Sequence, residues 1–400
     1  MEQRSVVVVG AKRTPMGRFM GAFADVPAVD LGIAAARAAL DAAAVDPGQV
    51  DETVAGHGRQ AGNGPNPGRQ VSIRAGVPET VPAYTVNKAC GSSAKALTLA
   101  AGSIMLGEID VALVVGMENM THTPYLLRGM RGGYRMGPVV IEDGMSSDGF
   151  MDPLAGEAMG ETAENLAERY AVSREEQDAF ALQSQRRAGE AWEAGRFAEE
   201  VVPVDTFDAR RRTVTVERDE HPRPDTTLEA LAKLKPVFRD PGTVTAGNSS
   251  GICDGAAALV VMAEETARAH GLRPLARVAG WASAGVDPHI MGWGVVPATQ
   301  KLLAKLGWAL PEIDVVEVNE AFAAQVLACD RELKFDWERT NVNGGAIALG
   351  HPIGATGARL LVTLLHGLRE RGGRRGIATL CVSGGMGLAA LVEMEEERAA

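Results

Sequence analysis

The two ends of the chain repeat one local plan, and this repeat constrains the fold more than any other feature of the sequence. Near the N-terminus, an apolar segment is followed by Cys90-Gly91-Ser92-Ser93, a helical pattern and an apolar segment at 111–115. Near the C-terminus, the glycine-rich run 350–357 precedes a helical pattern and an apolar segment at 377–382. Strand, turn, helix and strand in this order are typical of α/β units. The repeat therefore predicts an α/β protein built from two similar halves.

Short apolar runs and helical patterns also alternate through the rest of the chain. Helices are predicted at 31–40, 174–194 and 321–331. Strands are predicted at 6–9, 83–86, 111–115, 256–261, 315–318, 377–382 and 388–392.

The central segment differs from both ends in composition. Residues 121–247 hold most of the Arg, Asp and Glu clusters, but they are not rich in Pro and Ser throughout, as a linker would be. We expect an inserted domain at 121–247 that folds over the core. The N-terminal half would then be 1–120, completed by about 248–270, and the C-terminal half would be 271–400.

Composition and charge exclude several classes of protein. The chain has 400 residues, of which 46% are hydrophobic and 23% charged, as in globular proteins of two or three domains. Its 40 basic and 51 acidic residues give a net charge of −11, which argues against nucleic-acid or membrane-surface partners. We find no targeting segment and no apolar run of 18 residues, and we expect a cytoplasmic enzyme. The four cysteines are far apart, which predicts neither a disulfide framework nor a metal site.

Cys90 is the first candidate for chemistry. It follows a predicted strand and precedes a predicted helix, where free backbone N–H groups and the helix dipole would favour a thiolate. Its position alone is equally compatible with a buried structural cysteine at a strand–helix corner.

Three further residues stand at comparable turns. His351 lies between glycines in a rigid loop, although a lone histidine is often only a core residue. Cys381 ends a strand that opens into Ser383-Gly384-Gly385, a geometry suited to an oxyanion site if it is more than a turn. Asn319 lies between a strand and the helix predicted at 321–331, where it could cap the helix or hold a water. Together these residues could supply one thiolate to carry an acyl group, a second thiol to move a proton, and an activating imidazole.

These motifs resemble the thiolases, and most closely their acetyl-CoA acetyltransferase branch. The resemblance runs in the same order from end to end of the chain, which makes it highly specific. Besides the loop around His351 and the turn at Cys381, it includes residues 86–92, 116–120, 162–165, 243–251, 319–323 and 341–346.

The resemblance implies a two-step Claisen reaction. Cys90 would form a thioester while His351 accepts its proton, and Cys381 would then move the α-proton of a second acetyl-CoA. One oxyanion site would be His351 with a water held by Asn319, and the other the backbone N–H groups of Cys90 and Ser383. The reaction would join two acetyl-CoA into acetoacetyl-CoA and CoA, or cleave 3-ketoacyl-CoA with CoA in reverse.

Coenzyme A follows from the same resemblance, as a substrate and not as a tightly bound cofactor. The pantetheine and adenine would lie along Arg223, Phe238, Ala246 and Ser250, and the acyl end near Met159, Met291 and Phe322. The stretch 210–239 is the richest basic neighbourhood in this acidic chain, which suits a polyanionic ligand.

The family also implies the architecture and the assembly. Two similar halves, each with a mixed five-stranded sheet, would stack as α-β-α-β-α, and the inserted loop domain would cover the site and bind CoA. We expect a homo-oligomer whose dimers pair sheet edges. Residues 131–137 resemble the loop through which biosynthetic members form tetramers, so a homotetramer active in fatty acid metabolism is expected.

Two positions depart from the family pattern. Ala158 stands where short-chain biosynthetic members commonly have histidine, which allows longer 3-ketoacyl chains. Ser383 stands where glycine is usual, so its side chain would crowd the site unless the local backbone is ordinary.

Three other classes of protein are alternatives to a thiolase. A ketoacyl synthase would not need the second cysteine, Cys381. A non-catalytic thiolase-like protein that binds CoA or lipid would typically lack one of Cys90, Asn319, His351 and Cys381, all of which are present. A dinucleotide-binding oxidoreductase is rejected, because no G-x-G-x-x-G follows the first strand.

Overall fold

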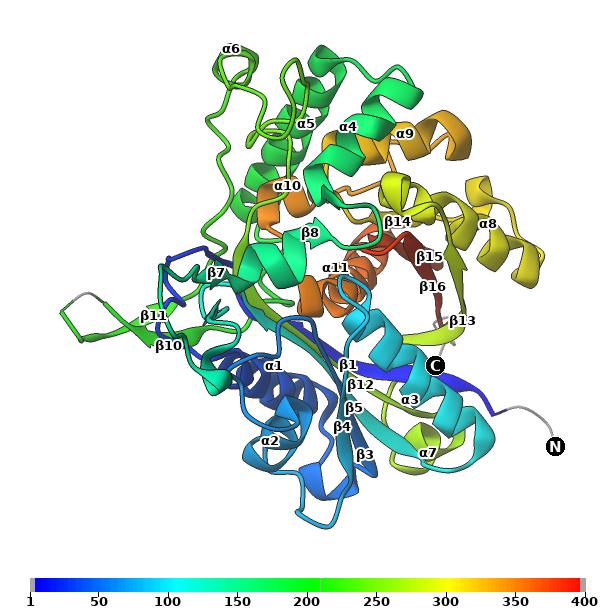
Figure 1. The fold of residues 1–400 in the computed structure, drawn as a ribbon. Coiled ribbons are helices and arrows are strands. Elements are labelled where there is room, and N and C mark those ends of the chain that lie inside the picture. The colour runs from blue at the N-terminus through cyan, green and yellow to red at the C-terminus, as the bar shows by residue number, and fades with distance from the viewer. Residues whose placement is uncertain (1–3, 209, 396–400) are drawn as a thin grey trace.

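The computed structural model describes residues 4–208 and 210–395, and a mixed β-sheet runs through it (Figure 1). The strand order is β14-β15-β16-β13-β1-β12-β5-β3-β4, and β2 (Gly17–Arg18) pairs with β12 beside this path. The N-terminal strands are β1 (Val6–Arg13), β3 (Glu52–His57), β4 (Ala83–Val86), β5 (Val111–Asn119) and β12 (Cys253–Ala263). The C-terminal strands are β13 (Ala276–Gly285), β14 (Val315–Val318), β15 (Arg375–Val382) and β16 (Met386–Met394). A short antiparallel pairing of β1 with β13 joins the two halves.

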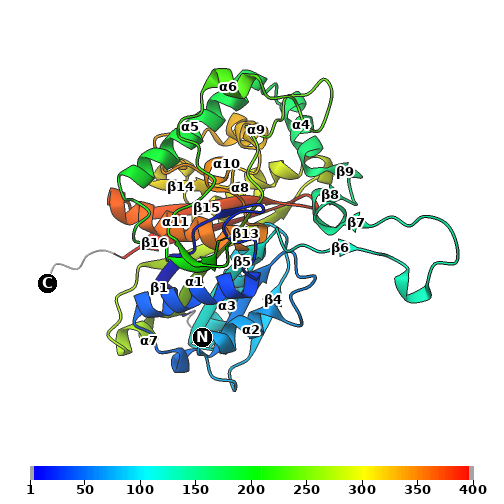
Figure 2. The same ribbon diagram turned by 90° about the vertical axis from the view of Figure 1, so that its left-hand side faces the viewer.

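Helices cover the sheet in three layers, so the molecule is stacked α-β-α-β-α as predicted (Figure 2). On the outer face of the N-terminal half lie α1 (Ala28–Ala43), α2 (Pro67–Arg74) and α7 (Glu264–Ala269). Between the halves lie α3 (Ser92–Leu106), which packs on strands of the N-terminal half, and α11 (Thr356–Arg371), which contacts α3 and strands of both halves. On the outer face of the C-terminal half lie α8 (Val295–Leu306) and α9 (Ala323–Leu333). Each interlayer space holds its own hydrophobic cluster.

Strand β12 illustrates why the strands of the central sheet are continuous apolar segments in the sequence. All eleven of its residues are buried, because helices pack on both of its faces. A strand covered on both sides does not alternate polar and apolar residues, in contrast to a strand at the surface.

The central helices meet through small residues at their N-terminal turns. A Cβ atom on Gly357 of α11 would lie 2.5 Å from the backbone nitrogen of Ala94 in α3. The hydroxyl of Ser93 also accepts a 2.9 Å hydrogen bond from the Ala358 backbone nitrogen. These contacts place the start of α3 against the start of α11, and the turns that precede both helices are thereby brought together.

The inserted segment adds helices α4 (Met159–Arg169), α5 (Arg174–Glu193) and α6 (Leu228–Ala232), the first two against α9. A capping box at Ser173 fixes the start of α5, since Ser173 and Glu176 each bond the other's backbone N–H. Helix α10 (Ala346–Leu349), from the C-terminal half, packs against α5. The predicted limits of this domain, 121–247, remain a prediction.

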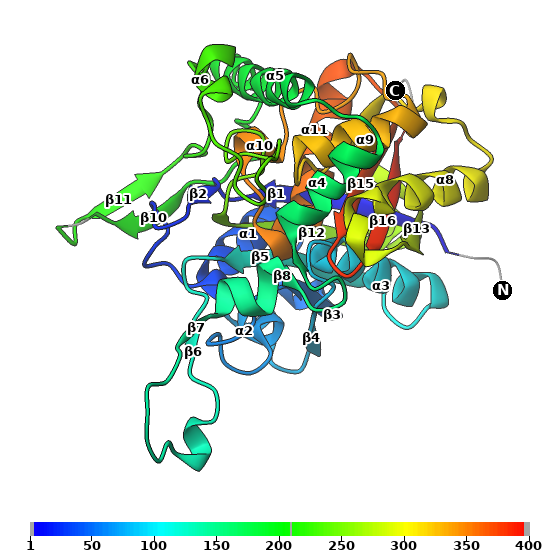
Figure 3. The ribbon, with the colours of Figure 1, turned by 45° about the horizontal axis from the view of Figure 1, so that its top comes forward.

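Two-stranded ribbons and short helical turns complete the structure. The ribbons are β6 (Tyr125–Leu126) with β7 (Glu142–Asp143), β8 (Met151–Asp152) with β9 (Glu157–Ala158), and β10 (Val204–Phe207) with β11 (Thr213–Val216). The chain between β6 and β7 and the β10–β11 hairpin both project from the body (Figure 3). The helical turns are η1 (Pro47–Gln49), η2 (Met130–Gly132), η3 (Ser146–Phe150), η4 (Pro288–Gly294), η5 (Leu310–Glu312) and η6 (Ile353–Ala355).

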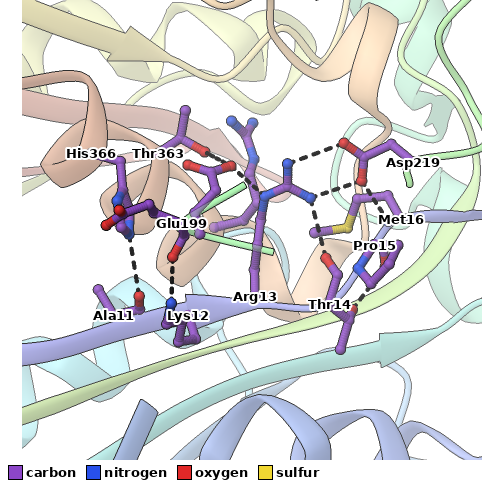
Figure 4. A network of polar contacts seen from close by, with 12 residues as sticks. Ala11, Lys12, Arg13, Thr14, Pro15, Met16, Glu199, Asp219, Thr363 and His366 are labelled. Atoms are coloured by element: carbon purple, nitrogen blue, oxygen red, sulfur yellow. Dashed lines mark hydrogen bonds and ion pairs between the residues drawn. The ribbon is translucent and has the colours of Figure 1, made fainter. Parts of the chain in front are cut away.

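A buried ionic network attaches the insertion to β1 (Figure 4). The Arg13 guanidinium donates to Glu200 at 2.5 Å and to both carboxylate oxygens of Asp219, at 2.7 and 3.0 Å. These carboxylates outweigh the burial of Arg13 and raise its pKa. Because all three side chains are buried, each charge depends on its partner, and Glu200 and Asp219 are held against β1.

Several sequence predictions need correction. The sequence analysis missed β3 and β13. The C-terminal part of the sheet has four strands and not five among the described residues, with only an isolated bridge from Thr340 to Val316 beside β14. The helix predicted at 321–331 begins at Ala323. Across residues 4–208 and 210–395, no helix is long and apolar enough to cross a membrane.

Candidate active site

Cys90 lies in a tight turn between β4 and α3. Ala89 has a left-handed φ of 44°, and the Ser92 hydroxyl accepts a 2.9 Å bond from the Lys88 backbone nitrogen while donating to the Ala89 carbonyl. Gly91 is the N-cap residue of α3. The turn therefore holds the Cys90 side chain just ahead of the helix N-terminus, as the sequence predicts.

The expected stabilisation of the Cys90 thiolate is wrong for the resting protein. Burial raises the pKa of this thiol, against the opposing effects of the Arg59 charge and of the Ser383 and Cys90 backbone N–H groups. Desolvation thus exceeds the effect of the helix terminus. The thiol stays protonated and needs a base.

His351 has the properties of that base. Its Nδ1 lies 2.5 Å from the Thr356 hydroxyl, which itself donates to the Pro352 carbonyl at 2.9 Å. Because that hydroxyl hydrogen is engaged, Nδ1 must be the donor, which leaves Nε2 with a free lone pair. Burial and the charge of Arg359 lower the pKa of His351 to about 3, so its imidazole is neutral at physiological pH.

Cys381 lies at the end of β15, fully buried, and its neighbours fix the following turn. Burial raises its pKa, as does its interaction with Cys90. A Cβ on Gly91 would lie 2.9 Å from the Val382 side chain, so the turns that carry the two thiols are adjacent. The buried Asp152 carboxylate accepts 2.8 and 2.9 Å bonds from the backbone nitrogens of Gly384 and Leu154. The inserted segment therefore anchors the turn that carries Ser383.

The departure at Ser383 does not disturb this turn. Ser383 is not among the residues with positive φ, whereas Gly384 and Gly385 have φ of 83° and 76°. An ordinary backbone accommodates serine, and its N–H points to the Cys90 sulfur.

Asn319 follows β14 and faces His351. Its backbone nitrogen donates to the Thr379 carbonyl at 2.9 Å, and its Nδ2 lies 3.4 Å from His351 Nε2. The alternative that Asn319 caps the next helix is wrong, because Phe322 occupies the N-cap position of α9. Its Oδ1 is buried and has no hydrogen-bond partner in the described part of the chain.

A cavity of about 570 Å³ joins the predicted residues. Cys90, His351 and Ser383 line it, while Cys381 and Asn319 are not part of the lining. Six of the seven residues predicted along the coenzyme line the same cavity: Met159, Phe238, Ala246, Ser250, Met291 and Phe322. The structure thus brings residues from 90 to 383 to one site.

Arg223 is the exception among the predicted contacts. It is exposed and does not line the cavity, and its backbone nitrogen donates to Gln185 at 2.6 Å. From this surface position, the Arg223 side chain could contact only the part of a ligand that extends out of the cavity. Ala158, the other departure, lies at the N-cap of α4 next to Met159 and is also outside the lining.

The sequence analysis missed several residues of the cavity. Arg18, Arg59 and His221 line it, and Glu118 supports it from behind by accepting the backbone N–H groups of Gly58, Arg59 and Gly354 at 2.8–3.0 Å. Arg59 follows β3 closely, and with β3 unrecognised nothing placed this residue at the edge of the sheet where the site lies.

A nucleophilic thiol, a neutral imidazole and a second thiol at the meeting point of two α/β halves define an acyl-transfer enzyme. The comparisons with known proteins agree. The chain matches the thiolase N-terminal domain at residues 6–265 and the thiolase C-terminal domain at residues 272–394. The chain belongs to the thiolase family, and the predicted α/β thiolase fold is confirmed.

Individual relatives support the same assignment along the whole chain. The acetyl-CoA acetyltransferase of Pseudomonas aeruginosa is 52% identical over 96% of this chain and 98% of its own. The structure of the acetyl-CoA acetyltransferase from Syntrophomonas wolfei matches with a TM-score of 0.96 and 45% identity, covering 98% of this chain and all of that chain. Human mitochondrial 3-ketoacyl-CoA thiolase in complex with CoA matches with a TM-score of 0.94 and 43% identity, covering 98% of both chains.

Proposed function

We propose that this chain, an acyltransferase of the thiolase family, joins two acetyl-CoA molecules into acetoacetyl-CoA and CoA, and catalyses the reverse thiolysis. The observation that carries the proposal is the shared cavity, in which Cys90, His351 and Ser383 meet, with the turn that carries Cys381 adjacent to that of Cys90. The names of the relatives support an acetyl substrate over the longer-chain alternative.

In the first half-reaction Cys90 becomes acylated. His351 Nε2 takes the thiol proton, the thiolate attacks the thioester carbonyl, and the proton passes to the departing CoA sulfur. The backbone N–H groups of Cys90 and Ser383 would stabilise the oxyanion that forms on the carbonyl oxygen. The buried thiol suits this order of events, because its thiolate appears only when the base is in place.

In the second half-reaction the Cys381 thiol first gives its own proton to His351 Nε2, and the Cys381 thiolate then removes the α-proton of another acetyl-CoA. The enolate attacks the Cys90 thioester, and its C–C bond forms as the C–S bond breaks. The α-proton stays on Cys381, and His351 returns its proton to the released Cys90 thiolate, so all three groups are neutral again. We place the enolate oxygen at the N–H of the protonated His351 Nε2 and at a water held by Asn319. The 3.4 Å approach of the two side chains and the unpartnered Asn319 Oδ1 support this placement.

Coenzyme A would enter past the inserted segment. Phe238 and Phe322 form an edge-on aromatic pair, with ring centroids 6.1 Å apart, beside Ala246 and Ser250 on the cavity wall. Gly160 is required there, since a Cβ on it would lie 2.2 Å from the Phe238 ring. Arg18 at the lining and Arg223 outside it offer positive charge to the phosphates.

The assembly and setting of the enzyme are also proposals. A homo-oligomer, and a tetramer in particular, is supported by the projecting loop between β6 and β7, which exposes Met136, Val140 and Ile141 (Figure 2). A cytoplasmic location and a part in fatty acid metabolism rest on the family and on the sequence expectations alone.

The direct test is CoA-dependent thiolysis of acetoacetyl-CoA by the purified protein. We expect the wild type to release acetyl-CoA and Cys90→Ser to lose at least about 10³-fold in rate, because the nucleophile is gone. A Cys90→Ser variant that retained wild-type activity would refute the proposal.

A further inference from the structure

Arg59 is a buried cation that lines the reaction cavity without a partner. Its side chain is only 8% exposed. Among the residues that the structure describes, its guanidinium makes no hydrogen bond and no ion pair, and its Nε is buried with no partner. A guanidinium cannot lose its charge in a protein, so an unpaired buried one is costly unless a ligand supplies an anion.

The Glu118 carboxylate attracts the charge of Arg59, but the two side chains form no direct ion pair. Glu118 is engaged by three backbone N–H groups and by His57, whose Nε2 lies 3.1 Å from it. Asp148 shares a small neighbouring cavity with Arg59 but forms no ion pair with it. The charge of Arg59 is therefore directed to the space in front of Cys90.

The backbone at Gly149 fixes the position of the Arg59 guanidinium. It packs flat on Gly149, where a Cβ would lie 2.3 Å from Arg59 Nη2 and 2.6 Å from Cζ. Gly149 and Phe150 continue the same cavity wall. A glycine at this point lets the guanidinium lie against the backbone.

Arg59 lies at the acyl end of the cavity. Its charge acts on both Cys90 and His351, the two residues at the reacting thioester. Phe238, one of the proposed coenzyme contacts, lies instead against Gly160 and Phe322. An anion beside Arg59 would thus belong to the acyl group and not to the phosphates of CoA.

We propose that Arg59 binds the terminal carboxylate of an acyl chain attached to Cys90, so that the enzyme also processes 3-ketoacyl-CoA substrates whose acyl chain ends in a carboxylate. This inference rests on the proposed thiolase function. It adds a substrate class, the CoA thioesters of 3-oxodicarboxylic acids, to the acetyl substrates.

The chemistry is that of the established reaction with a charged acyl group. The Cys90 thiolate attacks C3, the C2–C3 bond breaks, and C2 takes a proton to leave as acetyl-CoA. The carboxyacyl group then passes from Cys90 to the sulfur of CoA, whose proton returns through His351 to Cys90. Arg59 takes no part in bond making; it pairs with the distant carboxylate in both steps.

The test compares thiolysis of 3-oxoadipyl-CoA with that of 3-oxohexanoyl-CoA, which has the same six-carbon chain ending in a methyl group. For the wild type we expect kcat/KM to favour the carboxylate substrate by about 10-fold or more. Arg59→Leu should lower this ratio by about 100-fold, and Arg59→Lys should restore part of it. Arg186→Leu, an exposed arginine on α5, is the matched control and should leave the ratio unchanged.

A second variant, at Gly149, is designed to shift the Arg59 guanidinium without removing its charge. Gly149→Ala should displace the group and lower the same ratio, with acetoacetyl-CoA thiolysis as the reference reaction. Thermal unfolding of Arg59→Leu checks the fold, and we expect no loss of stability, since the variant removes an unpaired buried charge.

The outcomes separate the two proposals. A wild type that cleaves acetoacetyl-CoA but shows no carboxylate preference overturns the inference and leaves the proposed function intact. An Arg59→Leu variant that slows both six-carbon substrates equally also overturns it, because Arg59 would then act only on Cys90. Absence of acetoacetyl-CoA thiolysis in the wild type would refute the proposed function itself.

Discussion

At the scale of single residues, burial determines the protonation of the groups at this site. Burial raises the pKa of Cys90 and Cys381 and lowers that of His351 to about 3. All three groups are therefore neutral at rest, which suits a dry cavity where an uncompensated charge is costly. Proton transfer from Cys90 to His351 would create an ion pair only when substrate is ready to consume it.

The low pKa of His351 predicts a specific dependence of stability on pH. Its folded pKa of about 3 lies below the ordinary 6.5, so the unfolded chain binds this proton more readily. The contribution is present above pH 6.5 and is lost as the pH falls toward 3, by about 1.4 kcal/mol per pH unit. Urea unfolding of the wild type and His351→Asn between pH 7 and 4 measures it. The wild type should lose stability more steeply by that slope, and parallel curves would contradict the account.

The residues proposed to take part in the reaction could be predicted from the sequence. The buried charged residues around them could not. Cys90, His351 and Cys381 are recognisable because each stands at a glycine-flanked turn in a repeated pattern. Arg59 and Glu118 carry no such local signal. Their importance comes from burial and from contacts between distant parts of the chain, such as Glu118 with Gly354 and Arg59 with Gly149, which only the fold creates.

At the scale of elements, the site depends on the contact between α3 and α11. Each helix follows a turn that holds one residue of the proposed reaction, Cys90 or His351, and small residues let the helix starts approach closely. The distance between nucleophile and base is thereby set by backbone packing and not by flexible side chains.

A single methyl group tests this contact. Gly357→Ala would place a Cβ 2.5–3.0 Å from atoms of Ala94, so the helices must separate. We expect a loss of about 1–3 kcal/mol in the free energy of unfolding together with a large fall in thiolysis rate. Gly102→Ala in α3 is the control, because a Cβ there meets nothing within 4 Å and should be neutral or stabilising by up to about 1 kcal/mol. Equal effects of the two variants would contradict this role of the contact.

Predictions at the element scale succeeded where the pattern was strong. The strands at 83–86 and 315–318 match β4 and β14, and the helix at 174–194 matches α5 to within one residue. Strands β3 and β13 were missed because glycine, histidine, serine or tryptophan interrupt their apolar character. Pairing with their neighbours makes them strands, and that information is not local.

At the scale of the whole molecule, the stacked architecture brings the catalytic turns together, and the projecting loop offers a surface for assembly. Residues 127–141 extend from the body between β6 and β7 (Figure 3). Met136 is 97% exposed and Val140 77%, which is unfavourable for an isolated chain. Contact with another subunit would remove this apolar surface from water.

The loop therefore gives a prediction for the oligomeric state. Met136→Asp combined with Val140→Asp should convert a tetramer into a dimer in sedimentation velocity, since charges would be buried at the new contact. Thermal stability of the subunit should change little, because both side chains are at the surface. A tetramer that survives both substitutions would exclude the loop as its interface.

The proposed mechanism depends on two thiols with different roles: Cys90 carries the acyl group, and Cys381 moves the α-proton. Intact-protein mass spectrometry of Cys381→Ala after mixing with acetyl-CoA tests these roles most directly. We predict that the variant accumulates one acetyl group, absent in Cys90→Ser, and forms no acetoacetyl-CoA. A Cys381→Ala protein that condenses acetyl-CoA at the wild-type rate, or a Cys90→Ser protein that is acetylated as fully as the wild type, would contradict it.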